Sequence, residues 1–163
     1  MDIAADIQRI AEQERRLQLP QLDQDVAWHL GTRLREIAAQ RKMPLTIEIR
    51  LAGETCFFSS MPGTTPANTD WARRKRNVVE LMHRSSYGVG RSLERDGRTL
   101  EDMMGLPSRD YASHGGSFPL RLPNAGVVGV VTVSGAPQRE DHNMVVMALA
   151  ELCKVPLVEI ELA

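Results

Sequence analysis

The stretch GVVGVVTVSG, residues 126–135, decides the fold class. Its five valines occupy both alternating sets of positions, so an extended strand here is apolar on both faces. Such a strand belongs inside a sheet that has other layers packed on each side. The stretch therefore predicts a central strand whose sheet is covered by helices on both faces.

Three further extended segments are predicted around this strand. SFPLRL, residues 117–122, precedes it across the short PNA turn, which indicates an antiparallel hairpin. Apolar and polar residues alternate over 45–51, and TCFF, residues 55–58, follows a turn at AGE, which indicates a second hairpin. PLVEIELA, residues 156–163, alternates again and is interpreted as a terminal edge strand.

Helical spacing of apolar residues predicts four helices. Asp23 is suited to cap the second, and either Thr69 or Asp70 the third. Residues 94–116 are interpreted as a long irregular connection of the kind that is often functional. The order of helices and hairpins predicts an α+β fold with an antiparallel sheet between helical layers. The predicted helices cover residues 3–17, 23–43, 70–93 and 138–152.

Length and charge limit the classes of protein. A chain of 163 residues without repeats fits a single domain, residues 1–163. The formal net charge of -1 gives no overall attraction to nucleic acid or to an anionic membrane. The N-terminus does not resemble a signal peptide, and no run of residues reaches membrane-spanning length. We therefore expect a cytoplasmic protein without a nucleic-acid or membrane partner.

The spacing of cysteines and histidines does not predict a metal site. Cys56 and Cys153 lack CxxC or Cys/His ligand spacing, so each is interpreted as a small buried hydrophobe, with a single disulfide left open. The four histidines are scattered as well. One imidazole is nevertheless enough for an axial ligand to haem, and His114 is the best candidate.

Four cations in a row, RRKR, interrupt the predicted third helix. As a nucleic-acid patch the run is short and lacks interleaved aromatic residues. Helical geometry places Lys75 on the apolar face that Trp71 shares, with Arg74 at the edge of that face. Arg73 and Arg76 are predicted to point to the solvated side. Lys75 must then extend its amine to solvent, pair with a carboxylate or face a ligand.

Two glycine-containing loops are candidate anion-binding elements. In HGGSFP, His114 precedes Gly115 and Gly116, which can adopt positive φ and expose N–H groups. In VSGAPQREDH, Ser134 and Gly135 lead into a helix N-terminus, which favours anions. Because the loops bracket one hairpin, both are expected at the same end of the sheet. A ligand there is favoured by this convergence, although a simple turn is the common role of each loop.

A hydrolase triad is a further interpretation of the same region. Ser134, His114 or His142, and Asp141 have the residue types that nucleophilic catalysis requires. The GxSxG pattern of a nucleophile elbow is absent, however, and Asp141 is also suited to the first turn of a helix. The triad is therefore the least favoured of the functional hypotheses.

Three segments of the sequence resemble an uncharacterised family of the HbpS-like, GlcG-like haem-degrading domain superfamily. The resemblance covers almost the whole chain. It implies a three-layer α/β/α domain with a mainly antiparallel sheet of about five strands, similar in style to profilin. It also implies homo-oligomers and a small-molecule or tetrapyrrole pocket, but transfers no haem ligand to a position here. The segments are PGTTPANTDWARRKRNVVELMHRSSYGVG, YASHGGSFPLRL and GVVGVVTVSGAPQREDH, and the elements shared with haem-binding relatives are Gly115, Gly116, Gly129, Ser134, Gly135 and Asp141.

The leading hypothesis is a homo-oligomeric protein that binds a small anionic ligand, with haem or a related tetrapyrrole as the candidate cofactor. Slow degradation of haem would then be chemistry of its iron, which the protein permits. The alternative is an oligomeric scaffold in which Lys75, Ser86 and Gly90 are core or interface features. The candidate ligand-binding residues are Arg74, Lys75, His114, Gly115, Gly116, Ser134, Gly135, Asp141 and His142.

Overall fold

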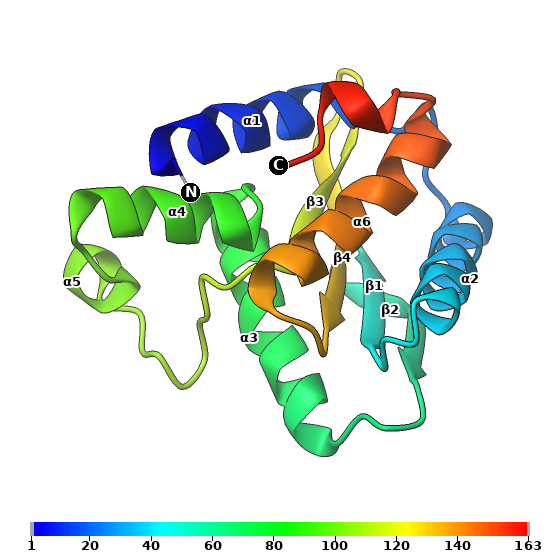
Figure 1. Cartoon of the computed structure of the whole chain (residues 1–163), viewed down its shortest axis with the longest axis horizontal. Coiled ribbons are helices and arrows are strands. Elements are labelled where there is room, and N and C mark those ends of the chain that lie inside the picture. The colour runs from blue at the N-terminus through cyan, green and yellow to red at the C-terminus, as the bar shows by residue number, and fades with distance from the viewer. Residues whose placement is uncertain (1, 163) are drawn as a thin grey trace.

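The predicted antiparallel sheet is present and has the strand order β2-β1-β4-β3. The structure is a computed structural model that describes residues 2–162. Every pair of neighbouring strands is antiparallel, and the valine-rich strand β4 lies between β1 and β3 (Figure 1). The central position predicted for residues 126–135 is therefore confirmed. The strands are β1 (Thr46–Leu51), β2 (Glu54–Ser60), β3 (Ser117–Leu122) and β4 (Gly126–Ser134).

Helices cover both faces of the sheet, as the valine-rich strand predicts. On one face, α2 packs on β1 and β2, and α6 packs on β4 and β3. On the other face, α3 contacts β4, β3 and β1, while α1 packs against α4 at the side of the domain (Figure 1). The fold is thus a three-layer α/β/α domain. The helices are α1 (Ile3–Arg16), α2 (Gln24–Gln40), α3 (Pro66–Met82), α4 (Ser86–Asp96), α5 (Leu100–Met104) and α6 (Gln138–Cys153).

The two faces of the sheet differ in chemistry. The face toward α2 and α6 is apolar and forms the main core, which includes Ile47, Ile49, Phe118, Val131 and Val133. The alternate positions, which face α3, are largely polar although they are also enclosed. These polar positions are Thr46, Glu48, Arg50, Ser117, Thr132 and Ser134. Because buried polar groups need partners, α3 supplies charged side chains to this face.

The predicted third helix, residues 70–93, is wrong in its extent. The helix begins earlier, at Pro66, and ends at Met82, where His83 takes a left-handed conformation with φ of 54°. A separate helix, α4, then begins because the Ser85 side chain accepts a hydrogen bond from the Gly88 N–H. The apolar periodicity continues across the break, so periodicity alone does not detect it. Local capping therefore overrides the sequence pattern.

Replacing Ser85 with alanine is expected to lower the free energy of unfolding by about 1 kcal/mol, because α4 loses its N-cap. Urea denaturation of the variant and the wild type measures this difference. Ser92→Ala is the matched control, since Ser92 lies within α4 and its hydroxyl bonds the Gly88 carbonyl. The free energy of unfolding should decrease less in Ser92→Ala, because side-chain bonds to the backbone inside a helix contribute little to stability. Equal losses in the two variants would contradict the capping role.

The sheet has four strands instead of about five, because the C-terminal segment is not a strand. After Pro156 the chain forms a short 3-10 helix, η1 (Leu157–Glu159). The Ile160 carbonyl then accepts a hydrogen bond from the Gln13 side chain at 2.7 Å, which holds the segment against α1. Beside β3, away from β4, the chain forms an isolated parallel bridge between Gln18 and Arg121 in place of a fifth strand. The last residue of the predicted strand, 163, lies outside the described residues.

The connection over residues 94–116 is less irregular than predicted. It contains α5, which Thr99 and Asp102 begin with a capping box. Residues 105–116, here called the α5–β3 segment, then lead to β3 without helix or strand. This segment carries His114 and both glycines of the HGG loop.

The two cysteines do not form the disulfide that their sequence left open. Cys56 and Cys153 are free thiols, and both are partly buried against the main core. Burial raises the pKa of Cys153 to about 11, so it is protonated at neutral pH.

Within residues 2–162, none of the helices has both the length and the apolar composition required to cross a membrane.

Candidate functional site

Lys75 is paired with a carboxylate inside the protein. From α3, its amine lies 2.8 Å from Asp141 Oδ2 in the first turn of α6 and 3.3 Å from the Val133 carbonyl oxygen. Only 5% of the Lys75 side chain and 1% of the Asp141 side chain are exposed. Of the three possibilities for Lys75, the structure therefore shows the ion pair.

Asp141 also organises the loop between β4 and α6. Its carboxylate accepts hydrogen bonds from the N–H groups of Gly135, at 3.3 Å, and Ala136, at 3.0 Å. Burial raises the pKa of Asp141 and lowers that of Lys75, and attraction between the two groups opposes both shifts. The pair thus joins α3, β4 and α6 at one end of the sheet.

A pocket of about 230 Å³, here called the lysine pocket, opens above this ion pair. The predicted residues Lys75, His114, Ser134, Gly135 and Asp141 all line it. The two glycine-containing loops therefore lie at the same end of the sheet, which confirms their predicted convergence. Asn68, Trp71, Ala136 and Gln138 complete the lining. Sequence reasoning did not assign Trp71 to the site, although it lies one helical turn before Lys75.

His114 stands at the mouth of the lysine pocket beside Trp71. The two rings are 5.1 Å apart between centroids and meet edge to face at 70°. Partial burial, together with the positive charges of Lys75 and Arg74, lowers the pKa of His114. The imidazole is therefore neutral at pH 7, so one ring nitrogen has a lone pair for a metal ion or a hydrogen-bond donor.

Gly115 and Gly116 shape the lysine pocket without lining it. A Cβ on Gly116, whose φ is 130°, would lie 2.4 Å from the Val133 carbonyl oxygen and 2.9 Å from the Lys75 amine. A Cβ on Gly115 would lie 2.0 Å from the Gln138 carbonyl oxygen. Only glycine lets the backbone approach so closely. These residues therefore hold the HGG loop against β4 and α6.

His142 faces away from the pocket into the core. It is almost fully buried between the rings of Tyr87 and Phe118, and its Nε2 lies 2.8 Å from Gln13 Oε1. Among residues 2–162, no hydrogen bond joins a histidine to Ser134 or to Asp141. The arrangement that a hydrolase triad requires is not assembled in this structure.

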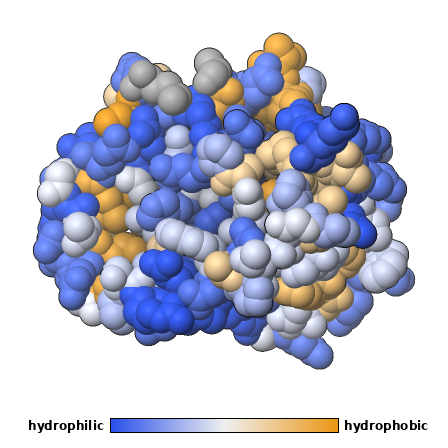
Figure 2. Space-filling model, turned by 60° about the horizontal axis from the view of Figure 1, so that its bottom comes forward, coloured by the Kyte–Doolittle hydropathy of each residue, from blue (hydrophilic) through white to orange (hydrophobic). Residues whose placement is uncertain are grey.

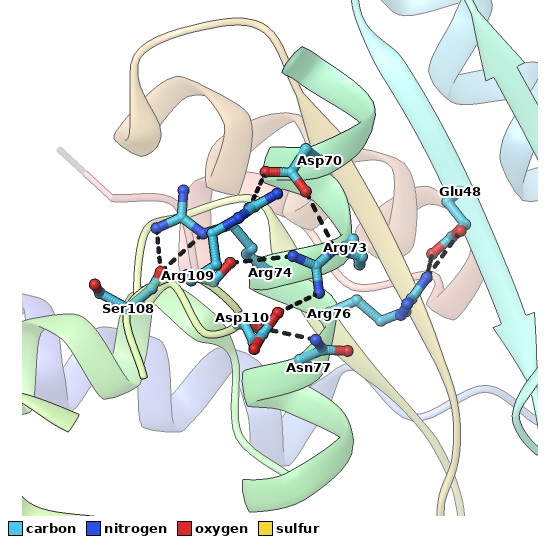
Figure 3. Close-up of polar contacts among 9 residues, drawn as sticks. All are labelled: Glu48, Asp70, Arg73, Arg74, Arg76, Asn77, Ser108, Arg109 and Asp110. Atoms are coloured by element: carbon cyan, nitrogen blue, oxygen red, sulfur yellow. Dashed lines mark hydrogen bonds and ion pairs between the residues drawn. The ribbon is translucent and has the colours of Figure 1, made fainter. Parts of the chain in front are cut away.

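Arg73 and Arg76 are less solvated than predicted. Arg76 has only 14% of its side chain exposed and donates to Glu48 on β1 at 2.8 Å, because the α3 face of the sheet is polar. Arg73, with 33% exposed, pairs with Asp70 and Asp110 (Figure 3). The prediction of a solvated side is therefore wrong for Arg76 and only partly correct for Arg73.

Arg74 lies outside the lysine pocket and beside it. Its Nε and Nη2 both donate to the Ser108 carbonyl oxygen, at 3.0 and 2.5 Å (Figure 3). Its guanidinium lies 4.4 Å from the centre of the Trp71 ring. Among the described residues, the contacts of the Arg74 guanidinium include no carboxylate. The other three cations of the RRKR run each pair with at least one carboxylate. Arg74 is thus the cation of this run whose charge is available to an external anion.

A larger hollow of about 610 Å³ lies on the other flank of α3, beside β1 and β2. Its two arginines, Arg73 and Arg76, are already neutralised by carboxylates, and its lining includes no histidine. Lys75 in the lysine pocket is neutralised as well, but this pocket also has the imidazole of His114, so it has the better chemistry for a metal-containing ligand despite its smaller volume. Over residues 2–162, no group of three or more His, Cys, Asp or Glu side chains is placed to hold a metal ion.

Comparison with known proteins places this geometry in a family. A family model described as haem-degrading protein HbpS-like matches residues 22–150. A UPF0303 protein of Azotobacter vinelandii is 52% identical over 162 residues, which cover 99% of this chain and 98% of that protein. The chain belongs to the HbpS-like haem-degrading family. The family predicted from the sequence is therefore confirmed.

Solved structures show the same HbpS-like fold. The Ybr137w protein is 26% identical, with a TM-score of 0.84, and the match covers 91% of this chain and 87% of that one. A PduOC:heme complex is 20% identical, with a TM-score of 0.67, and the match covers 79% of this chain and 93% of that one. The predicted fold class is confirmed by these similarities, apart from the number of strands.

Proposed function

We propose that this HbpS-like protein binds haem, or a related tetrapyrrole or small anionic ligand, at the lysine pocket as a homo-oligomer. The observation that carries the proposal is the neutral imidazole of His114 beside the Trp71 ring at the mouth of this pocket. A related fold crystallised with heme, as the PduOC complex, supports the choice of ligand.

The residues present fit a flat ligand that carries a metal. His114 offers one nitrogen as an axial ligand, and Trp71 offers an aromatic surface for a porphyrin ring. The Lys75–Asp141 pair holds the two loops that frame the pocket. When bound, haem would supply redox chemistry through its iron. His114 would hold the iron, and slow degradation of haem would be chemistry that the iron supplies and the protein permits.

The lysine pocket is too small to enclose a whole tetrapyrrole. Ligand pockets usually measure about 300–1,000 Å³, whereas the lysine pocket measures about 230 Å³. A tetrapyrrole must therefore extend beyond it. A neighbouring groove of about 390 Å³ shares His114 with the lysine pocket and could hold the remainder. In the proposed homo-oligomer, a second subunit over the mouth would enclose the exposed edge of the ligand.

Replacing His114 with alanine is expected to weaken haem binding at least about tenfold, because the axial nitrogen is lost. Titration with micromolar haemin, followed by the shift of the Soret band, measures this. His29→Ala is the control, since His29 is exposed on α2, across the sheet from α3. If the wild-type protein gives no Soret shift, haem binding is excluded. If both variants bind as the wild type does, His114 is not the ligand.

The alternative function is an oligomeric scaffold without small-molecule chemistry. The internal pairing of Lys75 favours it, as does the packing of Ser86 and Gly90. Ser86 Oγ lies 3.1 Å from the N–H of Ser117, and a Cβ on Gly90 would lie 2.0 Å from the Ser113 carbonyl oxygen. These features need no ligand. The absence of any Soret shift in the wild-type titration would favour this alternative.

A further inference from the structure

We propose that the groove between α4, α5 and the α5–β3 segment, here called the α4–α5 groove, receives the carboxylates of the ligand through Arg74 and Arg98. This inference rests on the proposed function and deepens it. It assigns the groove to a planar, apolar ligand with carboxylate groups, and it assigns the two arginines to those groups. Arg98 is a new residue of the proposed site, and Arg74, whose charge is available to an external anion, is assigned a defined part of the ligand.

The α4–α5 groove has the shape and lining of a ligand site. Its volume of about 390 Å³ falls within the usual range for ligand pockets. Apolar side chains line it, among them Leu93, Leu100, Leu106 and Tyr111. Figure 2 shows hydrophobic residues between hydrophilic ones on the side of the molecule where α5 lies in Figure 1. The groove therefore offers apolar contact to the body of a flat ligand.

The groove adjoins the proposed haem ligand. His114 lines both the α4–α5 groove and the lysine pocket, so it stands between the two hollows. Arg74 lines the groove and packs over the ring of Trp71, which lines the lysine pocket. A ligand coordinated by His114 can therefore lie partly in the groove and reach Arg74 with a carboxylate.

The charges in the groove favour an anion. Arg74 donates to the Ser108 carbonyl oxygen through Nε and Nη2, and within residues 2–162 its Nη1 group makes no hydrogen bond. In the same part of the chain, the side chain of Arg98 makes neither a hydrogen bond nor an ion pair, although its charge helps to lower the pKa of Asp96, which is paired with Arg95. Two acidic residues also line the groove, but Glu94 is neutralised by Arg91 at 2.5 Å. Two available cations thus face one remaining acid, Glu101.

The test compares haemin with haemin dimethyl ester, which keeps the iron and the ring but lacks both carboxylates. Titrations of the wild-type protein followed by the Soret band should show about tenfold tighter binding of haemin, which corresponds to about 1.4 kcal/mol. Arg98→Gln and Arg74→Gln should each reduce this preference severalfold. Arg95→Gln is the control, because Arg95 lies near the end of α4, three residues before Arg98, and does not line the groove; within residues 2–162 its ion pair is with the adjacent Asp96.

Arg98→Gln is the decisive variant, since its side chain holds no other part of the protein in place. Arg74→Gln also releases the Ser108 carbonyl, so Arg73→Gln, which loosens the same segment at Asp110, serves as its structural control. Equal affinity of the wild type for haemin and its dimethyl ester would overturn the inference. It would also be overturned if Arg98→Gln and Arg74→Gln lost affinity for the two compounds to the same extent. A wild-type protein that binds neither form would overturn the proposed function as well.

Discussion

Replacing Asp141 with alanine is expected to lower the free energy of unfolding by about 3–5 kcal/mol, because the change leaves the buried Lys75 ammonium without its counter-charge. The N–H groups of Gly135 and Ala136 lose their acceptor at the same time. Lys75→Met should lower the free energy of unfolding by less than Asp141→Ala does, since the Asp141 carboxylate keeps those two hydrogen bonds. The order of the two losses therefore tests the claim that Asp141 is the centre of this cluster.

Urea or guanidinium denaturation of both variants measures these losses. Glu140→Ala is the matched control, because Glu140 lies next to Asp141 in α6 and is exposed. Its expected change is within about 0.5 kcal/mol of zero. A loss for Asp141→Ala no larger than that of Glu140→Ala would contradict the account of the buried pair. A greater loss for Lys75→Met than for Asp141→Ala would contradict the central role of the carboxylate.

Acid is expected to destabilise the protein through His142. Burial, together with the nearby charge of Arg139, lowers the pKa of His142 to about 3, whereas the usual value is 6.5. Between these values the unfolded state binds the proton and the folded state does not. Stability is therefore complete above pH 6.5 and falls as the pH is lowered toward 3. At about 1.4 kcal/mol per pH unit, the loss at pH 4.5 is about 3 kcal/mol.

The free energy of unfolding measured between pH 7 and pH 4.5 checks this prediction. The glutamine of His142→Gln cannot gain a proton, so this variant should lose most of the dependence of the free energy of unfolding on pH. Its amide can still donate to Gln13. His29→Gln, on the exposed face of α2, is the matched control variant. His114, whose pKa is also lowered, adds a smaller contribution of the same sign. A slope that persists in His142→Gln would assign the acid sensitivity to other groups.

Much of the architecture follows from local patterns. The five valines in residues 126–135 correctly indicate a strand with a layer on each side, because burial on both faces requires apolar residues at successive positions. The hairpins follow from alternation between turns. The position of Lys75 on an apolar helical face correctly indicates that this cation is buried and needs a partner. These predictions are correct because each depends on a pattern of residues within a single helix, strand or hairpin.

The features that were missed depend on distant residues or on single caps. The partner of Lys75 is 66 positions away in the chain, and no periodicity connects it with Asp141. The end of α3 depends on the conformation of His83 and on the hydroxyl of Ser85, which a stripe of apolar residues does not register. The C-terminal alternation fits a strand equally well, but contact with α1 stabilises a 3-10 turn instead.

The Lys75–Asp141 pair also changes the interpretation of the lysine pocket. Since the ammonium is neutralised internally, the pocket floor does not attract an anion by net charge. In the proposed site, the attraction would come from Arg74 and Arg98 in the α4–α5 groove, while His114 would supply the coordinating nitrogen. The ion pair thus acts as a structural support for the loops that place His114.

A crystal structure of the protein with bound haemin tests the central claim most directly. The account predicts electron density for one porphyrin with its iron coordinated by His114, its ring against Trp71 and its carboxylates toward Arg74 and Arg98. It also predicts an unbroken Lys75–Asp141 pair beneath the ligand. Haemin bound elsewhere on the molecule, or held without His114, would contradict the account.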